Sequence, residues 1–281
     1  MNRISTILTL LQQFIRRGGE LTGFDKNDVR LGVNFARMML RDRFLGSMLG
    51  SAWAILNPAL MLLLFCFVFG VVFQSRLPGS LSGFAFIIWL ISGYGPWLAM
   101  SEALINSTNV IVSQAGVVKN MAFKTEILPF SASAVALVPL SVSLVLLCVL
   151  LVLDGRPPTV AWLILPVVLI LQMAFIIGIG LVLAASNVFL RDISQVLPNV
   201  LTLALFISPI FYELVQFPEL VRPVAAWNPL YLIANGYRAP IVNGVLPPLA
   251  HLVVLLALAA SSLGFGLWYF RRLKTYFSGR I

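Results

Sequence analysis

The sequence predicts an all-α protein that crosses a membrane several times. Of its 281 residues, 60% are hydrophobic and only 10% are charged, whereas about a quarter of the residues in soluble domains are charged. The mean hydropathy is +0.98. Residues 52–73 contain no charge at all, and about 20 apolar residues suffice to cross the hydrocarbon core. The net charge is +9. The charged residues flank apolar runs, so they indicate membrane topology and argue against nucleic-acid binding.

Residues 1–51 are expected to form a cytoplasmic N-terminal segment that contains an amphipathic helix at about 28–45. Polar and apolar residues recur there at helical spacing on opposite faces: Arg30, Asn34, Arg37 and Arg41 on one, Leu31, Phe35 and Met38 on the other. Asp25 or Asn27 is placed to cap the start of the helix. Such a helix lies in the membrane interface, and its basic face meets either lipid headgroups or a partner protein.

Residues 52–281 are expected to form the transmembrane domain, with six transmembrane helices. The six runs lie at about 52–74, 83–104, 127–153, 160–186, 194–212 and 249–270, and the second and fifth are the least apolar. With both termini in the cytoplasm, only Arg76, Arg156, Arg222 and Arg238 of the 19 Lys and Arg residues fall on the outer side. The positive-inside rule therefore favours this orientation.

The segment 213–245, before the last span, is too apolar for a solvated loop and too rich in proline for a span. Pro218, Pro223, Pro229 and Pro240 interrupt it. We expect a re-entrant pair of short helices, with a turn at Asn228 because the residue before a proline is biased away from helix. Irregular backbone at membrane depth persists where protein or water satisfies it, as it does beside a transport path.

Several kinds of chemistry are missing from the sequence. It contains no G-x-x-x-x-G-K-[ST] phosphate loop, no H-E-x-x-H and no cluster of metal ligands, and His251 is its only histidine. Cys66 and Cys148 lie inside apolar runs, where we interpret them as packing residues. The central parts of the spans carry no carboxylate, which argues against a proton- or sodium-coupled carrier. If the chain performs transport, the energy comes from another subunit.

Four blocks of residues carry a resemblance to a known family. They are Arg41-Asp42, Gly46, Leu49-Gly50, Trp53 and Leu56-Asn57-Pro58; Val118-Lys119, Phe123 and Glu126-Ile127-Leu128-Pro129; Asn187-Val188-Phe189, Arg191-Asp192-Ile193, Ser208-Pro209-Ile210 and Tyr212; and Asn228-Pro229-Leu230, Arg238 and Gly244. In this order, they resemble the permeases of bacterial type-2 ABC exporters for surface polysaccharide, which export O-antigen, capsule or teichoic acid. One departure is Lys124, because the family often has proline after this phenylalanine.

The resemblance implies a homodimer of permeases in the bacterial inner membrane, with two copies of a separate ATP-binding subunit docked below. ATP and magnesium would belong to that subunit, leaving no cofactor, metal or catalytic residue on this chain. The substrate would be a lipid-linked polysaccharide, with membrane lipids as further partners and no nucleic acid. Residues 28–45 would be an interface helix and Asn109–Phe123 a coupling helix. The ATPase-coupling residues would be Arg37, Arg41, Asp42, Lys119, Phe123, Arg191 and Asp192.

Two further sets of residues follow from the resemblance. Aromatic side chains that would line the channel and stack on sugar rings are Phe65, Phe69, Phe73, Phe206 and Tyr212, although lipid contact or packing is an alternative for each. The periplasmic gate would comprise Trp227, Asn228, Pro229, Tyr231 and Arg238. Arg238 would brace the closed mouth, meet an anionic lipid carrier, or extend to the interface. Trp53, Trp89, Tyr94 and Trp97 lie near predicted span ends, where aromatic residues anchor a protein in the membrane.

Two other functions remain open from the sequence. One is a type-2 ABC permease for lipid or drug efflux, although such permeases often carry a large external domain or a fused ATPase. The other is a non-transporting membrane scaffold, which would need neither a re-entrant segment nor paired coupling loops.

Overall fold

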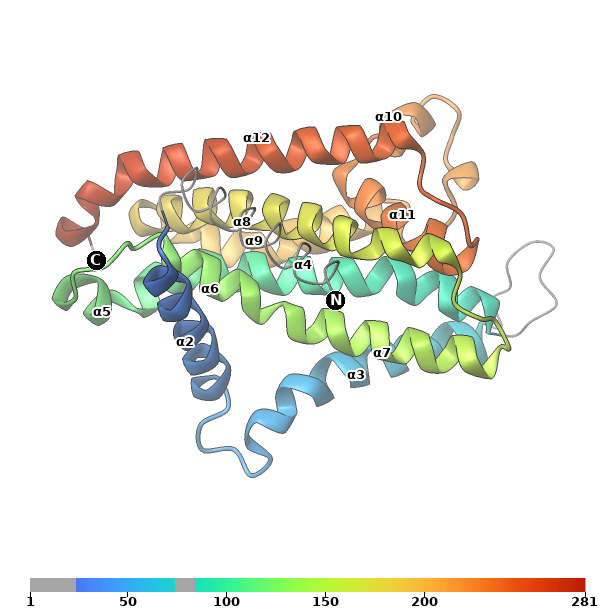
Figure 1. Cartoon of the computed structure of the whole chain (residues 1–281), viewed down its shortest axis with the longest axis horizontal. Coiled ribbons are helices and arrows are strands. Elements are labelled where there is room, and N and C mark those ends of the chain that lie inside the picture. Colours follow the sequence, from blue (N-terminus) through green and yellow to red (C-terminus); the bar gives the residue numbers. More distant parts are fainter. Residues whose placement is uncertain (1–23, 74–83, 281) are drawn as a thin grey trace, which may run out of the picture.

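The computed structural model describes residues 24–73 and 84–280, and all regular structure within them is helical. Figure 1 shows long helices running side by side along the longest axis of the molecule, with α2 crossing them at a steep angle. Helix α5 and the C-terminus lie at one end of this bundle, which we call the C-terminal end. Helices α10 and α11 lie at the opposite end, which we call the far end.

The long elements alternate with short ones. In chain order, the helices are α2 (Lys26–Asp42), α3 (Trp53–Phe65), α4 (Ala85–Ser113), α5 (Ala115–Asn120), α6 (Ile127–Val135), α7 (Leu137–Leu153), α8 (Leu165–Phe189), α9 (Asp192–Ile207), α10 (Arg222–Ala226), α11 (Pro229–Val242) and α12 (Leu249–Leu273). Four short 3-10 helices and one π-helix extend or join them. The 3-10 helices are η1 (Gly50–Ala52), η3 (Val160–Ile164), η4 (Leu214–Gln216) and η5 (Lys274–Gly279), and the π-helix is η2 (Cys66–Val72).

Within the described residues, four helical stretches are long and apolar enough to cross a membrane. They are Gly50–Val72, Ile127–Leu153, Val160–Phe189 and Leu249–Phe277. These correspond to the first, third, fourth and sixth of the expected spans. In place of the second is α4, which has 29 residues and is less apolar. In place of the fifth is α9, an apolar helix of 16 residues that is short for a span.

Helix α4 lies at the centre of the bundle, where it contacts α6, α7, α8, α9 and α11. A helix surrounded by protein does not need the uniform apolarity of a helix that faces lipid, which accounts for its weaker hydropathy. It also continues past the expected end at residue 104. Thr108 Oγ1 donates to Leu104 O over 2.6 Å and Asn109 Nδ2 donates to Ile105 O over 3.1 Å. These polar side chains bond to carbonyls of their own helix, so helix α4 accommodates them in the segment that was expected to be a loop.

The run Ile127–Leu153 is divided into α6 and α7 at Ala136. Pro139 lies just inside α7 and has no N–H to donate to the carbonyl four residues earlier, at Val135. The hydrogen bond that would continue the helix is therefore missing at this point, and the Ala136 N–H bonds instead to Ser133 O, over 3.1 Å.

Two hydrophobic cores hold the bundle together. The larger core joins α4, α7, α8, α9, α11 and α12 around side chains such as Ile88, Leu147 and Ile176. The second core, which we call the end core, lies at the C-terminal end and joins α2, α4, α6, α8, α12 and η5. Its buried members are Phe35, Val110, Ile111, Ile127, Leu128, Ala132, Leu181, Ala184, Ala185, Val188, Phe270 and Phe277.

Candidate functional site

Helix α2 is attached to the bundle by its apolar stripe. Asp25 caps the helix, accepting from Lys26 N over 2.7 Å, while Asp28 accepts from Asp25 N over 2.8 Å. Phe35 is buried in the end core, with its ring 5.6 Å from that of Phe123. Helix α2 packs on α6, so its apolar face is covered by protein. The opposite face, with Arg30, Arg37 and Arg41, is exposed.

Ion pairs fasten both ends of α2. Near its start, Lys124 Nζ lies 2.5 Å from Asp28 Oδ2. The hydrogen bond from Lys124, and then that from the Asp25 N–H, hold the pKa of Asp28 below its usual value. Just beyond its end, Arg43 pairs with Glu102 of α4. Lys124 thus ties the α5–α6 loop to α2.

The C-terminal end also contains a buried carboxylate. Glu126, at the start of α6, is 2% exposed and accepts from Lys274 Nζ over 2.8 Å and from Arg271 Nε over 3.2 Å. Burial alone would raise the pKa of Glu126, but the hydrogen bond from Lys274, a backbone hydrogen bond, the charge of Lys274 and the hydrogen bond from Arg271 together hold the pKa below its usual value. This carboxylate therefore stays charged near neutral pH and links α6 to α12 and η5.

The residues expected to meet an ATP-binding subunit fall into two groups. Lys119 on α5, together with Arg191 and Asp192 at the α8–α9 turn, is exposed at the C-terminal end. Arg37, Arg41 and Asp42 are exposed along α2, which leads away from that end toward α3 (Figure 1). Phe123 is partly buried against Phe35. The segment Asn109–Phe123 is not a single helix, because α4 ends at Ser113 and α5 covers only Ala115–Asn120.

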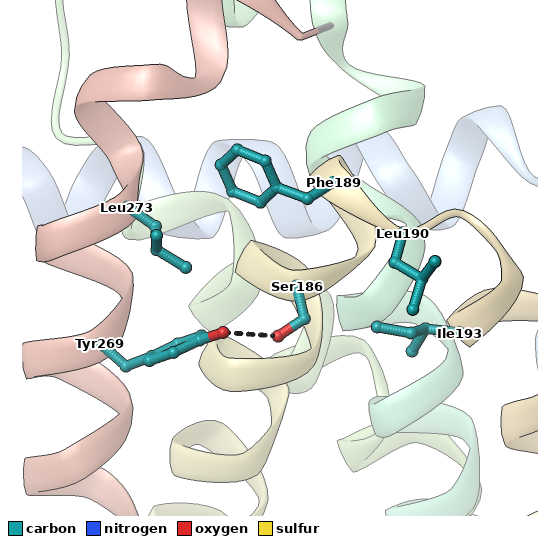
Figure 2. A pocket seen from close by; sticks show the side chains of 6 residues that line it. All are labelled: Ser186, Phe189, Leu190, Ile193, Tyr269 and Leu273. Atoms are coloured by element: carbon teal, nitrogen blue, oxygen red, sulfur yellow. Dashed lines mark hydrogen bonds between the residues drawn. The ribbon is translucent and has the colours of Figure 1, made fainter.

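A pocket of about 480 Å³ lies beside the α8–α9 turn. Figure 2 shows its walls: Ser186 and Phe189 from α8, Leu190 and Ile193 from the turn and α9, and Tyr269 and Leu273 from α12. Ser186 Oγ and Tyr269 Oη are 3.2 Å apart, so either can donate to the other. The rest of the lining is apolar. The pocket is thus lined by residues of α8, α9 and α12.

An aromatic cluster joins α3 and η2 to α4 and to the segment after α9. Phe65, Phe69 and Phe73 follow one another along one face, with ring centroids 6.0 Å apart for the first pair and 5.7 Å apart for the second. Phe211 connects them to Phe206, its ring being 5.3 Å from Phe65, 5.9 Å from Phe69 and 5.7 Å from Phe206. Phe73 and Phe206 are more than half exposed. The cluster therefore combines partly buried rings, Phe65, Phe69 and Phe211, with rings that are open on the outside of the chain.

Two short helices occupy the segment before α12. Asn228 forms the turn between them: its Oδ1 accepts from Leu230 N over 2.9 Å and its Nδ2 donates to Ser208 Oγ over 2.9 Å. The following Pro229 occupies the first turn of α11, where a missing N–H costs nothing. The expected turn at Asn228 is therefore present. It is bonded to the end of α9 as well as to its own helix.

Arg238 on α11 is 4% exposed. Its guanidinium donates to the backbone carbonyls of Trp89, Pro209 and Ile210, the last two over 2.8 and 2.5 Å. Its Cζ lies 3.8 Å from the centre of the Trp89 ring, a cation–π contact. Gly93 makes room for it, since a Cβ there would lie 2.3 Å from Nη2. Arg238 thus fastens α11 to α4 and to the chain after α9, and it does not extend to a lipid interface.

The neighbouring residue forms a second buried link. Tyr237 Oη donates to Gln172 Oε1 over 2.7 Å, and Gln172 Nε2 donates to Pro96 O over 2.9 Å. Both side chains are fully buried. Pro96 lies inside α4, and Gln172 of α8 donates to its carbonyl. Helices α4, α8 and α11 are therefore joined by one continuous chain of hydrogen bonds.

Comparison with known proteins identifies the family. A family model described as ABC-2 type transporter matches residues 30–242, which is most of the chain. The chain belongs to the ABC-2 type transporter family. The match begins on α2 and ends with α11, so it includes the aromatic cluster, the α8–α9 turn and Arg238.

Relatives of this ABC-2 chain are named for polysaccharide export. The O-antigen export system permease protein RfbA of Myxococcus xanthus is 30% identical over 239 residues, or 82% of this chain and 90% of the relative. The protein of the same name from Klebsiella pneumoniae is 26% identical over 208 residues, covering 74% and 78% of the two chains. The polysialic acid transport protein KpsM of Escherichia coli is 27% identical over 225 residues, covering 79% and 85%.

Some residues of the ABC-2 chain stand out only in the structure. Tyr94, expected in an interfacial belt, is buried with its ring 4.5 Å from Phe65. Phe211 links the aromatic cluster, whereas the expected Tyr212 packs 5.2 Å from Phe217, away from Phe65 and Phe69. Gln172 had one detectable feature, because it is a lone amide in a long apolar run. Trp227 and Tyr231 gather around His251 at 5.5 and 6.1 Å, and thus lie against the start of α12.

Proposed function

We propose that this chain is the permease subunit of an ATP-driven exporter that moves a lipid-linked polysaccharide, such as O-antigen or capsule, across the bacterial inner membrane. The observation that carries the proposal is the ABC-2 match over residues 30–242 together with relatives named as O-antigen and polysialic acid transport proteins. The aromatic cluster supports a sugar substrate, because flat apolar rings suit the C–H faces of sugar rings.

The proposed topology has six crossings, with both termini in the cytoplasm. Four crossings are the stretches found by length and composition. Helix α4, at the centre of the bundle, is the second, and α9 is the fifth. Helices α10 and α11 would be the re-entrant pair at the outer side, since they lie at the far end (Figure 1). The C-terminal end then faces the cytoplasm and carries Lys119, Lys124, Arg271 and Lys274, as the positive-inside rule requires.

Two such permeases would pair, and two separate ATP-binding subunits would dock at the C-terminal end. ATP and magnesium would be bound by those subunits. The exposed charges at Arg191, Asp192 and Lys119 support this docking surface, because charges at the rim of an interface steer and orient a partner. The exposed basic face of α2 supports a second contact, with the partner or with anionic lipid headgroups, since its apolar face is already covered by α6.

The channel would pass the aromatic cluster. Phe73 and Phe206 are 64% and 57% exposed in the single chain, so a second permease placed beside α3 and α9 would enclose them. Phe65 and Phe69 would continue the lining inward. Trp227, Asn228, Pro229, Tyr231 and Arg238 would form or support the outer mouth, with Arg238 as the residue that holds α11 in place.

The test is reconstitution in proteoliposomes with the ATP-binding subunit that purifies with the chain. ATP hydrolysis is measured alone, with extracted lipid-linked glycan, and with the same lipid lacking glycan. We expect stimulation by the glycan-bearing lipid only. Equal stimulation by the bare lipid would favour a lipid exporter, and failure of any ATP-binding subunit to copurify would contradict the proposal.

A further inference from the structure

The end of the chain folds back between two elements of the C-terminal end. Within η5, Phe277 is 1% exposed. Its ring centroid is 5.4 Å from that of Phe270 on α12 and 6.2 Å from that of Phe189. Phe189 is the last residue of α8 and borders the pocket of Figure 2, across from Leu273. Through this contact, the C-terminal turn reaches the α8–α9 turn that carries Arg191 and Asp192.

The same turn reaches the α5–α6 loop through charge. Lys274, its first residue, donates to the buried Glu126 over 2.8 Å, and Arg271, one turn earlier on α12, donates to the same oxygen over 3.2 Å. Glu126 lies three residues after Phe123, which packs on Phe35 of α2. This ion pair is much better shielded from water than a surface pair, because the acid is buried.

These contacts differ from ordinary surface packing in one respect. Two residues of one short turn, Lys274 and Phe277, touch two different elements, and both contacts belong to the end core or to its edge. Well-packed interiors transmit displacement because they leave little free volume. The adjacent Tyr276 is 64% exposed. The chain thus inserts one of two neighbouring aromatic rings and leaves the other in solvent.

We propose that Phe277 and Lys274 are positioning residues, which hold the α5–α6 loop and the α8–α9 turn at a fixed separation. A partner that docks at the C-terminal end then displaces both elements together. The fixed separation, which is the first statement, concerns this chain alone. The joint displacement by a partner, which is the second statement, rests on the proposed function, because it requires an ATP-binding subunit at this surface.

The first statement is tested by the distance between two spin labels in the permease alone, reconstituted in nanodiscs. The labels are placed at Gly116 on α5, where a side chain has open space, and at the exposed Gln195 on α9. Cys66 and Cys148, the free cysteines of the described residues, are first replaced by alanine. We expect a narrow distance distribution in the parent protein and in Tyr276→Ala, and a distribution at least about twice as wide in Phe277→Ala. An unchanged width in Phe277→Ala overturns the inference.

Two further variants keep the test decisive. Phe277→Leu refills the buried site with an apolar side chain, so we expect it to restore the narrow distribution. Glu126→Gln keeps the shape of the side chain but removes the charge that Lys274 and Arg271 contact. We expect it to broaden the distribution as well, and it replaces Phe277→Ala if that variant does not insert. A parent-like width in Glu126→Gln would contradict the positioning role of Lys274.

The second statement is tested by export. Surface glycan is measured in cells whose own copy of the gene has been deleted and replaced by each variant. We expect Phe277→Ala to reduce surface glycan about fivefold or more, the lower range of energetic coupling between sites, while the variant is still present in the membrane and still copurifies with its ATP-binding subunit. Normal export by this variant overturns the second statement. If the parent chain itself restores no glycan, the proposed function fails, and the spin-label result still stands.

Discussion

Arg238 illustrates how a charged residue is accommodated deep in this fold. A buried cation is costly unless it is hydrogen-bonded, and here three backbone carbonyls and the face of Trp89 receive it. Two of those carbonyls, at Pro209 and Ile210, belong to the chain just after α9, where the helix has ended and carbonyls lack helical partners. The guanidinium of Arg238 therefore supplies donors to the carbonyls just after α9, and these carbonyls in turn stabilise its buried charge.

The first prediction concerns Arg238→Lys. Lysine keeps the charge but lacks the planar fork that reaches three carbonyls. Because each hydrogen bond of a charged group contributes roughly 1.5–3 kcal/mol, we expect the free energy of unfolding to fall by about 3 kcal/mol. Denaturant unfolding in detergent, followed by tryptophan fluorescence, measures this loss. Arg30→Lys, on the exposed face of α2, is the control. Equal stability of the two variants would contradict the role assigned to Arg238.

The second prediction concerns pH. The pKa of Glu126 in the folded chain lies below its ordinary value of 4.5, so the folded state favours the charged carboxylate. This stabilisation is fully present above pH 4.5 and is lost as the pH falls through the folded pKa. We expect the parent protein to lose thermal stability below pH 4.5 by more than Glu126→Gln does. Melting temperatures from pH 7 to pH 3 compare the two. Parallel curves would mean that the ion pair contributes no pH-dependent stability.

Individual residues were predictable from the sequence where their role is local. The cap at Asp25 and the turn at Asn228 depend on nearby backbone, so their residue types indicate them. Tyr94, Phe211 and Gln172 depend on partners far along the chain: Gln172 bonds to Pro96 and Tyr237. Nothing in the sequence around these positions specifies such partners. The ring–ring contacts of the aromatic cluster were therefore missed, although Phe65, Phe69, Phe73 and Phe206 were named together as aromatic residues of one channel.

At the scale of whole elements, helices α8 and α12 approach each other unusually closely. A Cβ at Gly178 would lie 2.2 Å from the backbone carbon of Ser262, and a Cβ at Gly266 would lie 2.2 Å from Gly178 O. Small residues allow such contact between membrane helices, where packing replaces the hydrophobic effect as the main attraction. Helix α12, mostly exposed elsewhere, is held to the bundle mainly along this line.

The third prediction tests this contact with a matched pair of glycines. Gly178→Ala places a methyl group against backbone, which cannot rotate away, so we expect a loss of stability of about 1–3 kcal/mol or more. Gly264→Ala lies on α12, where the added methyl meets nothing within 4 Å, and we expect no loss there. Thermal unfolding in one detergent compares the variants. A stable Gly178→Ala would show that the two helices can separate without cost.

Helix boundaries were predictable to the extent that hydropathy determines them. The uncharged run after residue 51 and the last span match helices closely, because both are exposed and apolar. The second span was expected to end at 104, but α4 continues to Ser113. Hydropathy averages count Thr108 and Asn109 as loop residues, whereas their side chains bond to the helix. Burial of α4 among other helices, which no local window detects, makes this polarity tolerable.

At the scale of the whole molecule, the charge distribution makes a fourth prediction. Lys and Arg gather at the C-terminal end, and Arg156 lies between α7 and α8 at the other end of those helices. We therefore expect reporter fusions after Gly279 and after Arg156 to lie on opposite sides of the membrane, with the first in the cytoplasm. Alkaline phosphatase and fluorescent-protein fusions measure the two sides. Fusions that report the same side would refute the six-span topology.

The last prediction concerns the source of energy. Apart from Arg238, the buried links described inside the bundle are made by uncharged groups, such as Gln172 with Tyr237 and Ser107 with Ser133. The one fully buried acid among the described residues, Glu126, is held charged at the C-terminal end. Proton-coupled carriers need a titrating group along the path, and the sequence has no phosphate loop to bind ATP.

In proteoliposomes, we expect an imposed proton gradient to drive no glycan transfer through the chain alone. ATP should drive transfer once the ATP-binding subunit is added. Transfer by the isolated chain in response to the gradient would show that a titrating group on the path had been overlooked, with Glu102 and Glu126 as the first residues to replace.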